Sequence, residues 1–255
     1  MGVRATLLLS FALLLLAAPS VGAAPSIRWS VVASHPHDPS AFTEGLVAYG
    51  GVLLESTGLD GQSTIRRVDP TTGAVLLERW LPAMLFGEGL TVLGGSAVQL
   101  TWTEHRLLAW EPAALTPTAN RRYPYVGWGL TTNGRQLIAS DGTATVRWLD
   151  PATLKVRRAV RVHDGARVID RINELELRDG ILWANVWRSD RIALIDPADG
   201  RVRAWVDCAA LRRRLSAPGE VLNGIARDPV TGHMAVTGKL WPELFVIRLV
   251  GRVPA

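Results

Sequence analysis

Six side chains of this 255-residue chain have the types needed to move a proton while holding a polar substrate. They are one carboxylate, three indoles, one carboxamide and one ammonium: Glu88, Trp102, Trp128, Trp187, Asn173 and Lys239. Indole rings around a carboxyl group lower the local polarity, which disfavours the charged form and raises the pKa toward a range useful for acid/base work. A carboxamide and an ammonium donate hydrogen bonds, so they can orient a carbonyl oxygen and stabilise negative charge developing on it. These residues are far apart in sequence, so the fold must bring them together.

A repeated three-residue phrase supplies the register for such a fold. Its five copies, spaced by 44, 40, 45 and 50 residues, are Glu44-Gly45-Leu46, Glu88-Gly89-Leu90, Trp128-Gly129-Leu130, Asn173-Glu174-Leu175 and Asn223-Gly224-Ile225. A period of this size predicts one supersecondary unit repeated about an axis. The first residue of the phrase varies, and radial closure would gather the five first residues into one ring.

Each unit carries the signals of short antiparallel strands. Turn pairs follow the phrases at Gly50-Gly51, Gly94-Gly95, Asn133-Gly134, Asp179-Gly180 and Thr231-Gly232, and they predict hairpins. A third strand ends in an acidic-Pro step in four units, as at Asp69-Pro70, because proline cannot donate to a ladder. The fifth unit lacks this step, and we expect residues 27–32 to supply its outer strand and close the ring. The sequence therefore predicts an all-β, five-bladed β-propeller with four-stranded antiparallel blades, whereas a β-sandwich would not explain the five-fold register.

The hairpins also predict which residues share a face. An antiparallel hairpin places the end of its second strand beside the start of its first. The residues at or just past those ends are Thr57, Trp102, Asp141, Trp187 and Lys239. We therefore expect Trp102, Trp187 and Lys239 to join Glu88, Trp128 and Asn173 around one mouth of the central channel. We expect the other seven tryptophans, Trp80 among them, to pack between blades, Asp141 and Asn185 to cap turns, and the five histidines to be structural or exposed.

The N-terminus reads as a secretory signal peptide. Arg4 precedes an apolar stretch over residues 7–18, and small residues follow it, so cleavage is expected after Ala23. We predict a signal peptide over 1–23 and a single catalytic propeller domain over 24–255, periplasmic or secreted and not membrane-bound once the signal is removed. An uncleaved N-terminal anchor is the alternative.

Composition excludes several other classes of protein. Cys208 is the single cysteine, so an intramolecular disulfide is excluded and a buried structural thiol is expected. The formal net charge is +5, but the basic residues are scattered and form no stripe interleaved with aromatic residues, so no nucleic-acid partner is expected. Nothing in the sequence indicates oligomerisation, and we expect a monomer.

Ten ordered motifs, from about Phe42 to Phe245, resemble the plant and bacterial type of glutaminyl-peptide cyclotransferase (glutaminyl cyclase). They include Phe86-Gly87-Glu88-Gly89-Leu90-Thr91, Gly127-Trp128-Gly129-Leu130-Thr131 and Thr237-Gly238-Lys239-Leu240-Trp241-Pro242. The resemblance implies an enzyme that converts the N-terminal glutamine of a peptide or protein into pyroglutamate and releases ammonia, without metal or cofactor. It also implies that Glu88 is the acid/base and that Trp102, Trp128, Trp187, Asn173 and Lys239 contact the substrate.

One residue departs from the pattern of that family. Glu44 stands where many members have Gln, in Phe42-Thr43-Glu44-Gly45-Leu46. We expect Glu44 to line the substrate site as a second carboxylate near Glu88, and two carboxylates at one mouth shift each other's titration.

Two other functions fit parts of the pattern. A calcium-dependent propeller lactonase would hold its metal with an axial Glu and two Asn, as Glu88, Asn173 and Asn223 would here, although six blades would be expected there. A non-catalytic propeller would use the aromatic mouth to hold a peptide or sugar.

Overall fold

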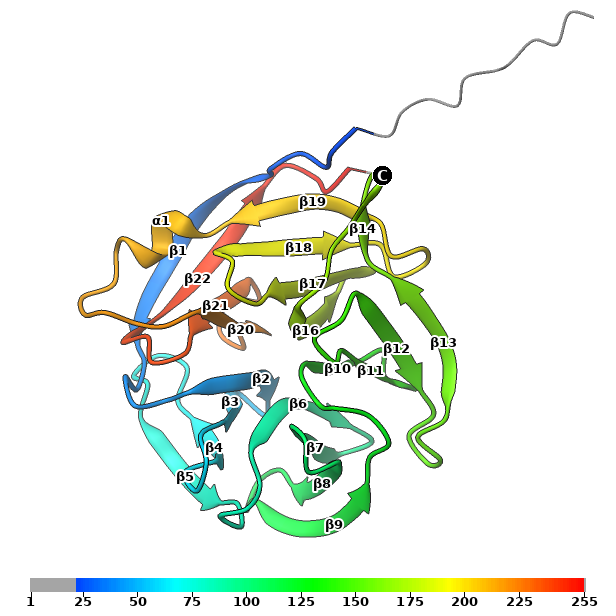
Figure 1. Cartoon of the computed structure of the whole chain (residues 1–255). Coiled ribbons are helices and arrows are strands. Elements are labelled where there is room, and N and C mark those ends of the chain that lie inside the picture. The colour runs from blue at the N-terminus through cyan, green and yellow to red at the C-terminus, as the bar shows by residue number, and fades with distance from the viewer. Residues whose placement is uncertain (1–21, 255) are drawn as a thin grey trace, which may run out of the picture.

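Five antiparallel sheets of four strands surround a central axis in the computed structural model, which describes residues 22–254 (Figure 1). The predicted all-β five-bladed propeller is confirmed. Within that described range the helical structure is limited to one short helix, α1 (Ala209–Arg212), and no helix is long and apolar enough to cross a membrane. Most of the predicted signal peptide, 1–23, lies outside the described residues.

The first three blades are formed by consecutive strands that run outward from the channel. Their bounds are β2 (Thr43–Tyr49), β3 (Val52–Thr57), β4 (Thr64–Val68) and β5 (Val75–Trp80) in blade 1; β6 (Gly87–Leu93), β7 (Ser96–Thr101), β8 (Arg106–Glu111) and β9 (Thr116–Arg122) in blade 2; and β10 (Leu130–Thr132), β11 (Leu137–Ala139), β12 (Thr145–Leu149) and β13 (Val156–Arg161) in blade 3.

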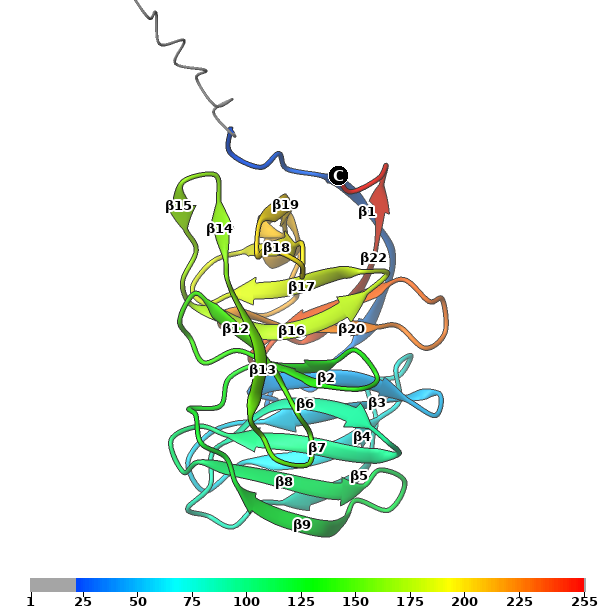
Figure 2. The ribbon, with the colours of Figure 1, turned by 90° about the vertical axis from the view of Figure 1, so that its right-hand side faces the viewer.

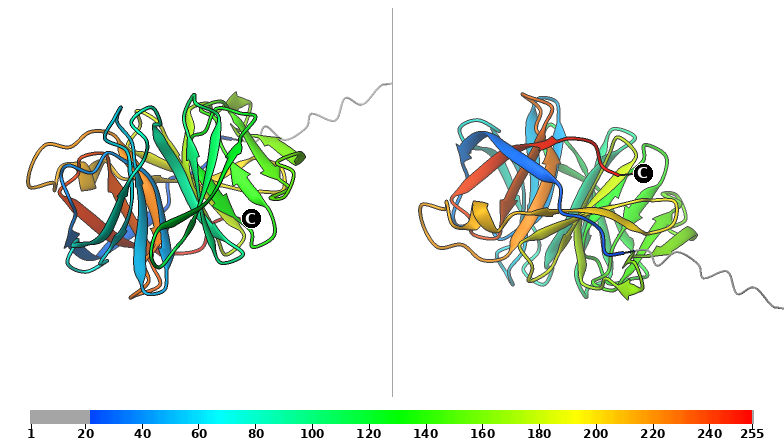
Figure 3. Two further views of the ribbon diagram at one scale, coloured as in Figure 1. Left: turned by 90° about the horizontal axis from the view of Figure 1, so that it is seen from below. Right: turned by 90° about the horizontal axis from the view of Figure 1, so that it is seen from above.

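The last two blades complete the ring, and the fifth takes its outer strand from the start of the chain. Their bounds are β16 (Ile172–Arg178), β17 (Ile181–Val186), β18 (Arg191–Ile195) and β19 (Val202–Asp207) in blade 4, and β20 (Leu222–Arg227), β21 (Met234–Gly238), β22 (Glu243–Val250) and β1 (Arg28–Pro36) in blade 5. β1 pairs antiparallel with β22, and Figures 2 and 3 show the two strands side by side. The predicted closure by the N-terminal strand is confirmed.

Between blades 3 and 4 the chain forms a two-stranded ribbon that the sequence did not predict. It consists of β14 (His163–Asp164) and β15 (Arg167–Val168) and stands away from the blades in Figure 2. Asp164 accepts hydrogen bonds from the Trp205 indole N–H (2.9 Å) and from the backbone N–H of Ala24 (2.6 Å). The ribbon therefore fastens the first described residues to blade 4.

The hydrophobic core is divided among the five blade junctions. Leu54 of blade 1 packs with Leu90 of blade 2, for example, and Ile225 of blade 5 packs with Ile192 of blade 4. Cys208 is buried in the junction between blades 4 and 5, as expected of a structural thiol. Trp80 is the exception among the tryptophans predicted to pack between blades: it ends outer strand β5 and is 61% exposed.

The repeated phrase coincides with a break in strand pairing. In blades 1, 2, 4 and 5 the register of the first strand shifts within the phrase, as between Gly87 and Leu90. Such a bulge turns a side chain away from the regular alternation of a strand. A Cβ on Gly89 would lie 2.3 Å from the Trp128 carbonyl oxygen, so the glycine allows adjacent blades to meet at the channel while its neighbour Glu88 is directed into the site.

Candidate functional site

One pocket of about 310 Å³, at the end of the channel where the first strands begin, collects every residue that the sequence placed in the site. Seven predicted residues line it: Glu44, Glu88, Trp102, Trp128, Asn173, Trp187 and Lys239. They come from all five blades, so the pocket exists only when the ring is closed. Six further lining residues were not predicted: Phe42, Leu59, Phe86, Arg188, Glu220 and Val221.

The hairpin pairing brings the two sets of positions together as expected. Gly87 pairs with Thr101, and the Trp102 N–H donates to the Phe86 carbonyl oxygen (3.1 Å), so Trp102 reaches the mouth that Glu88 lines. Ile172 pairs with Val186 in the same way, and Leu222 pairs with Gly238, so Trp187 and Lys239 reach the same mouth.

The two other positions predicted from the hairpins serve local structure. Thr57 shares a hydrogen bond with the Thr64 hydroxyl (2.7 Å). Asp141 caps its turn, as expected, by accepting the Thr143 N–H (3.2 Å), and it forms an ion pair with Arg147 (2.6 Å). Neither side chain lines the pocket.

Glu88 is a buried carboxyl group with little to stabilise its charge. The residue is 5% exposed, and Oε2 has no hydrogen-bond partner in the described part of the chain. Burial raises the pKa of Glu88 well above its usual range, and the nearby Glu44 carboxylate raises it further, while the Lys239 ammonium opposes both. The carboxyl group therefore holds its proton at a pH where an exposed glutamate has lost it.

Glu44 lies beside Glu88 but has a partner of its own. Lys239 Nζ donates a 2.5 Å hydrogen bond to Glu44 Oε1 and sits 4.4 Å from the centre of the Phe42 ring. Burial raises the pKa of Glu44, and Lys239 works against that shift. The expected second carboxylate is thus present in the pocket. It accepts a hydrogen bond from the Lys239 ammonium, which was expected to donate to the substrate.

Aromatic rings form the wall of the pocket. The Trp128 and Trp187 rings meet edge to face, 5.7 Å between centroids, and Phe86 packs against Trp102 at 5.6 Å. Glycine makes room beneath two of these rings. A Cβ on Gly142 would lie 2.7 Å from the Trp128 ring, and one on Gly58 would lie 2.4 Å from the Phe86 ring.

Asparagine side chains around the channel divide into two roles. Asn173 lines the pocket, is 3% exposed, and leaves its Oδ1 without a partner among the described residues. Asn223 lies outside the pocket and donates to the Thr43 carbonyl oxygen (2.9 Å), which ties blade 5 to blade 1. Asn185 does not cap a turn, contrary to expectation; it accepts the N–H of Gly224 (3.1 Å) and ties blade 4 to blade 5.

The calcium ligand set considered from the sequence is only partly assembled in this pocket. Glu88 and Asn173 line it, but Asn223 does not: its Nδ2 donates to the Thr43 carbonyl oxygen (2.9 Å), and its Oδ1, the atom that would bind calcium, has no partner among the described residues. Among residues 22–254, no three or more His, Cys, Asp or Glu side chains cluster closely enough to hold a metal ion.

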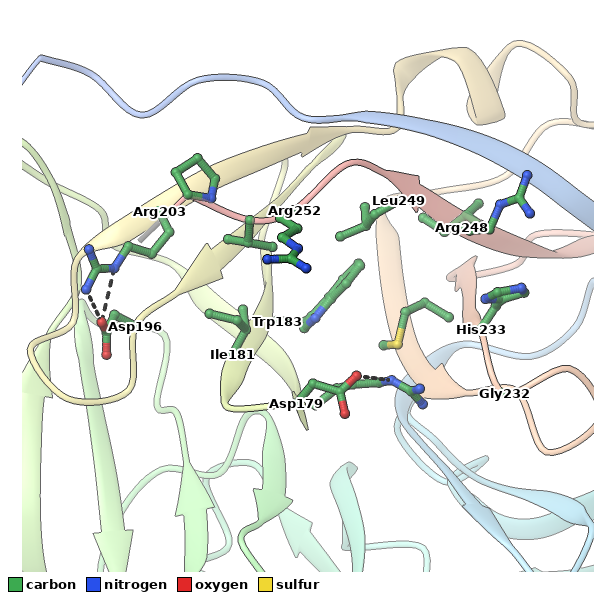
Figure 4. Close-up of a pocket in the computed structure, with 15 residues that line it drawn as sticks. Asp179, Ile181, Trp183, Asp196, Arg203, Gly232, His233, Arg248, Leu249 and Arg252 are labelled. Atoms are coloured by element: carbon green, nitrogen blue, oxygen red, sulfur yellow. Dashed lines mark hydrogen bonds and ion pairs between the residues drawn. The ribbon is translucent and has the colours of Figure 1, made fainter.

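A larger cavity of about 590 Å³ lies at the opposite end of the strands, near the β16–β17 and β20–β21 turns (Figure 4). Its acidic groups are each paired with arginine, Asp196 with Arg203 and Asp179 with Arg178. The hydrogen bonds from Arg203 and the Ala198 N–H lower the pKa of Asp196, and the cavity contains none of the predicted site residues. The smaller pocket is therefore the candidate active site.

Comparison with known proteins identifies relatives of this chain. A family model described as glutamine cyclotransferase matches residues 6–249. The chain is 43% identical to a glutaminyl-peptide cyclotransferase of Arabidopsis thaliana over 225 residues, which is 86% of this chain and 70% of that protein. It is also similar to the crystal structure of Myxococcus xanthus glutaminyl cyclase, with a TM-score of 0.81 and 36% identity over 88% of this chain and 98% of that one.

Proposed function

The chain belongs to the glutamine cyclotransferase family and is therefore an enzyme that acts on peptides or proteins. We propose that it cyclises their N-terminal glutamine to pyroglutamate and releases ammonia, with Glu88 as the acid/base. The observation that carries this proposal is the buried carboxyl group of Glu88, whose Oε2 has no partner among the described residues, in a pocket walled by indoles.

The reaction needs one proton to move between two nitrogens. The neutral α-amine attacks the γ-carboxamide carbon, a C–N bond forms, and the carbonyl oxygen gains negative charge. The amine nitrogen loses a proton, the carboxamide nitrogen gains one, and the old C–N bond breaks to release ammonia. Glu88 can give its own proton to the leaving nitrogen and take the amine proton in return, so it ends the cycle protonated as it began.

The remaining lining residues position the substrate. Trp102, Trp128 and Trp187 enclose it and exclude water, which strengthens every polar contact inside the pocket. Asn173 lies where it can orient the carboxamide, and the N–H groups of Lys239 not used by Glu44 are donors for the developing oxyanion. A volume of about 310 Å³ is at the small end of ligand sites and suits one terminal residue better than a peptide segment.

The test is incubation of the mature protein with a peptide that begins with glutamine. We expect mass spectrometry to show the loss of one ammonia, matched by ammonia in solution, at a rate unchanged by EDTA. The same peptide beginning with asparagine is the control. Binding of the glutamine peptide without ammonia release would leave the non-catalytic propeller as the function, and calcium-dependent hydrolysis of a lactone would indicate the other rival.

We further propose that the enzyme works as a monomer in the periplasm or outside the cell. Support for export comes from the charge and hydropathy pattern of residues 1–23, and the outer strand β1 begins at Arg28, after the expected cleavage site. Cell fractionation with N-terminal sequencing should find a secreted chain beginning at Ala24, and light scattering should give the mass of one chain. A cytoplasmic or uncleaved product would contradict this proposal.

A further inference from the structure

Glu174 breaks the pattern of the repeated phrase. The second residue of the phrase is glycine in the other four blades, where it lets neighbouring backbones approach closely. In blade 4 that position carries a glutamate, directly after the pocket residue Asn173. The register shift between Ile172 and Leu175 frees both side chains from the ladder. Blade 4 therefore has a long side chain, that of Glu174, at the second phrase position, where the other four blades have only a glycine hydrogen.

The carboxyl group of Glu174 faces the backbone of two other blades. Its Oε2 accepts the N–H of Ile225 (2.9 Å), the third phrase residue of blade 5. The N–H of Leu46, the third phrase residue of blade 1, faces the same carboxyl group. Blades 1 and 4 are not neighbours in the ring, so this side chain reaches across the channel.

The contact with blade 1 concerns the reaction because of what precedes Leu46. Glu44 lies two residues earlier, and its carboxylate holds Lys239 next to Glu88. Asn223 fixes the same stretch from blade 5 through the Thr43 carbonyl oxygen. The backbone that carries Glu44 is therefore held on the carbonyl side by Asn223, while on the N–H side the Glu174 carboxyl group lies against the Leu46 N–H, with its Oε1 outside hydrogen-bond distance of any partner in the described part of the chain.

The surroundings of Glu174 favour a neutral acid. The side chain is fully buried. Burial raises the pKa of Glu174 well above its usual range, and the neighbouring Glu176 carboxyl group adds to the shift, while the facing Ile225 and Leu46 N–H groups oppose it. A neutral carboxylic acid and a carboxamide have nearly the same shape and both present a carbonyl oxygen to a backbone N–H.

We propose that Glu174 is a positioning residue that spans the channel beneath the pocket and fixes the Glu44–Lys239 pair against Glu88. The inference rests on the proposed function of the pocket. It assigns Glu174 no contact with substrate; its effect on the reaction passes through the backbone of blade 1.

Two substitutions separate this role from a merely structural one. Glu174→Gln retains an oxygen acceptor, and we expect wild-type kcat and an unchanged pH profile. Glu174→Met has a similar volume but no oxygen acceptor, and we expect kcat to fall between about tenfold and 100-fold, as for a small misplacement of catalytic groups. The pH profile of kcat/KM should also move, because Glu44 and Lys239 both influence the titration of Glu88. Glu176→Gln, on the same strand and bonded instead to Thr131, is the matched control with wild-type kinetics.

Amide hydrogen exchange tests the contacts of Glu174 with blades 1 and 5 without reference to activity. The amides of Ile225 and Leu46 should exchange faster in Glu174→Met than in Glu174→Gln, while Leu90, in the phrase of blade 2, should not change. This result would stand even if the wild-type protein made no pyroglutamate, so failure of the proposed function and failure of this inference are distinguishable. Wild-type kcat, pH profile and amide exchange in Glu174→Met, or equal damage in both Glu174 variants, would overturn the proposal.

Discussion

Glu55 and Glu88 are two buried glutamates on inner strands of adjacent blades, and their environments shift their pKa values in opposite directions. Glu55 on β3 is 1% exposed and accepts hydrogen bonds from His37 (2.9 Å) and Thr43 (2.7 Å), with Arg66 3.3 Å away. Glu88 on β6 is 5% exposed and leaves one oxygen without a partner. Burial alone would raise the pKa of both. At Glu55 the charges and hydrogen bond of His37, with Arg66, outweigh burial and lower the pKa, whereas at Glu88 they are missing and the Glu44 carboxylate raises the pKa further.

The comparison shows how one fold separates stability from chemistry. Removing a buried carboxylate that has a full set of partners strongly destabilises the fold, because the partners are left as unpaired buried charges. A buried carboxyl group without partners adds little to stability, but it keeps a proton available near neutral pH. Depth of burial is the same in both cases, so the partners decide the role.

The largest expected effect is the loss of turnover in Glu88→Gln. Removing a positioned acid/base lowers kcat by about 10²–10⁴-fold, and we expect a decrease in that range for ammonia release. The unfolding free energy at neutral pH should not fall, because a neutral amide replaces a neutral acid. Turnover near the wild-type value would show that the proton travels by another group.

The second-largest expected effect is a loss of stability on substitution of Glu55, the glutamate whose charge is paired. In Glu55→Gln the charge of His37 loses its counter-ion and Arg66 loses one of its carboxylate partners while keeping Asp38 (2.7 Å). We expect the unfolding free energy to fall by about 3–5 kcal/mol. Denaturant titration measures it. The folded fraction should turn over close to the wild-type rate, since Glu55 does not line the pocket. If Glu55→Gln lost turnover while remaining stable, the division between the two glutamates would be wrong.

A smaller effect is expected at Glu44, which couples the pocket to its surroundings. Glu44→Gln removes a negative charge that raises the pKa of Glu88 and frees Lys239, which lowers it. The limb of the kcat/KM pH profile that reports Glu88 should therefore move to lower pH, by on the order of one pH unit for a coupled pair. An unmoved limb would indicate that Glu44 and Glu88 titrate independently. Glu176→Gln, a partly buried glutamate away from the pocket, is the control.

The smallest effect concerns the pH dependence of stability through His37. Its Nδ1 faces the Trp241 carbonyl oxygen (2.7 Å) and its Nε2 faces Glu55 Oε1 (2.9 Å). Both neighbours are acceptors, so the ring carries both protons. Burial works to lower the pKa of His37, but the charge and hydrogen bond of Glu55 outweigh it and the net shift is upward.

The sign of the linkage follows from the two shifts. A raised His37 pKa contributes stability that is complete below about pH 6.5 and is lost as the pH rises through the folded-state value. A lowered Glu55 pKa contributes stability above about pH 4.5 that is lost as the pH falls through the folded-state value. Denaturant unfolding between pH 5 and 9 should show the alkaline loss in the wild type and a flatter curve in His37→Gln. Equal slopes in the two proteins would contradict the assignment.

The sequence predicted the part of the molecule that repeats. Five copies of one phrase with intervening turn pairs were sufficient for the propeller, and antiparallel pairing then placed Trp102, Trp187 and Lys239 beside the phrase residues. Phe86, two residues before Glu88, supported the assignment of Glu88, but neither Phe86 nor Phe42 was predicted to line the pocket. Phe42 stands at the same spacing before Glu44, and this repeated spacing was the signal that could have identified both rings.

The rest depends on contacts between blades, which a repeat does not encode. Asn185 has the sequence context of a turn residue. Its hydrogen bond to Gly224 depends on how blade 5 packs against blade 4 and cannot be inferred from the sequence around Asn185. The partners of Glu55 come from residues 37, 43 and 66, which share no motif. Trp80 was expected to be buried because it is a tryptophan, but no further strand covers β5.

The contrast between the two glutamates can be measured directly by infrared spectroscopy of the carboxyl groups. The difference spectrum between the wild type and Glu88→Gln at pH 6 should contain the C=O stretch of a protonated, buried carboxylic acid. Apart from the bands of the introduced carboxamide, the difference spectrum with Glu55→Gln should contain carboxylate bands and no C=O stretch of a carboxylic acid. A carboxylate signature lost in Glu88→Gln would mean that Glu88 is ionised in the resting enzyme, and would contradict its role as the group that holds the travelling proton.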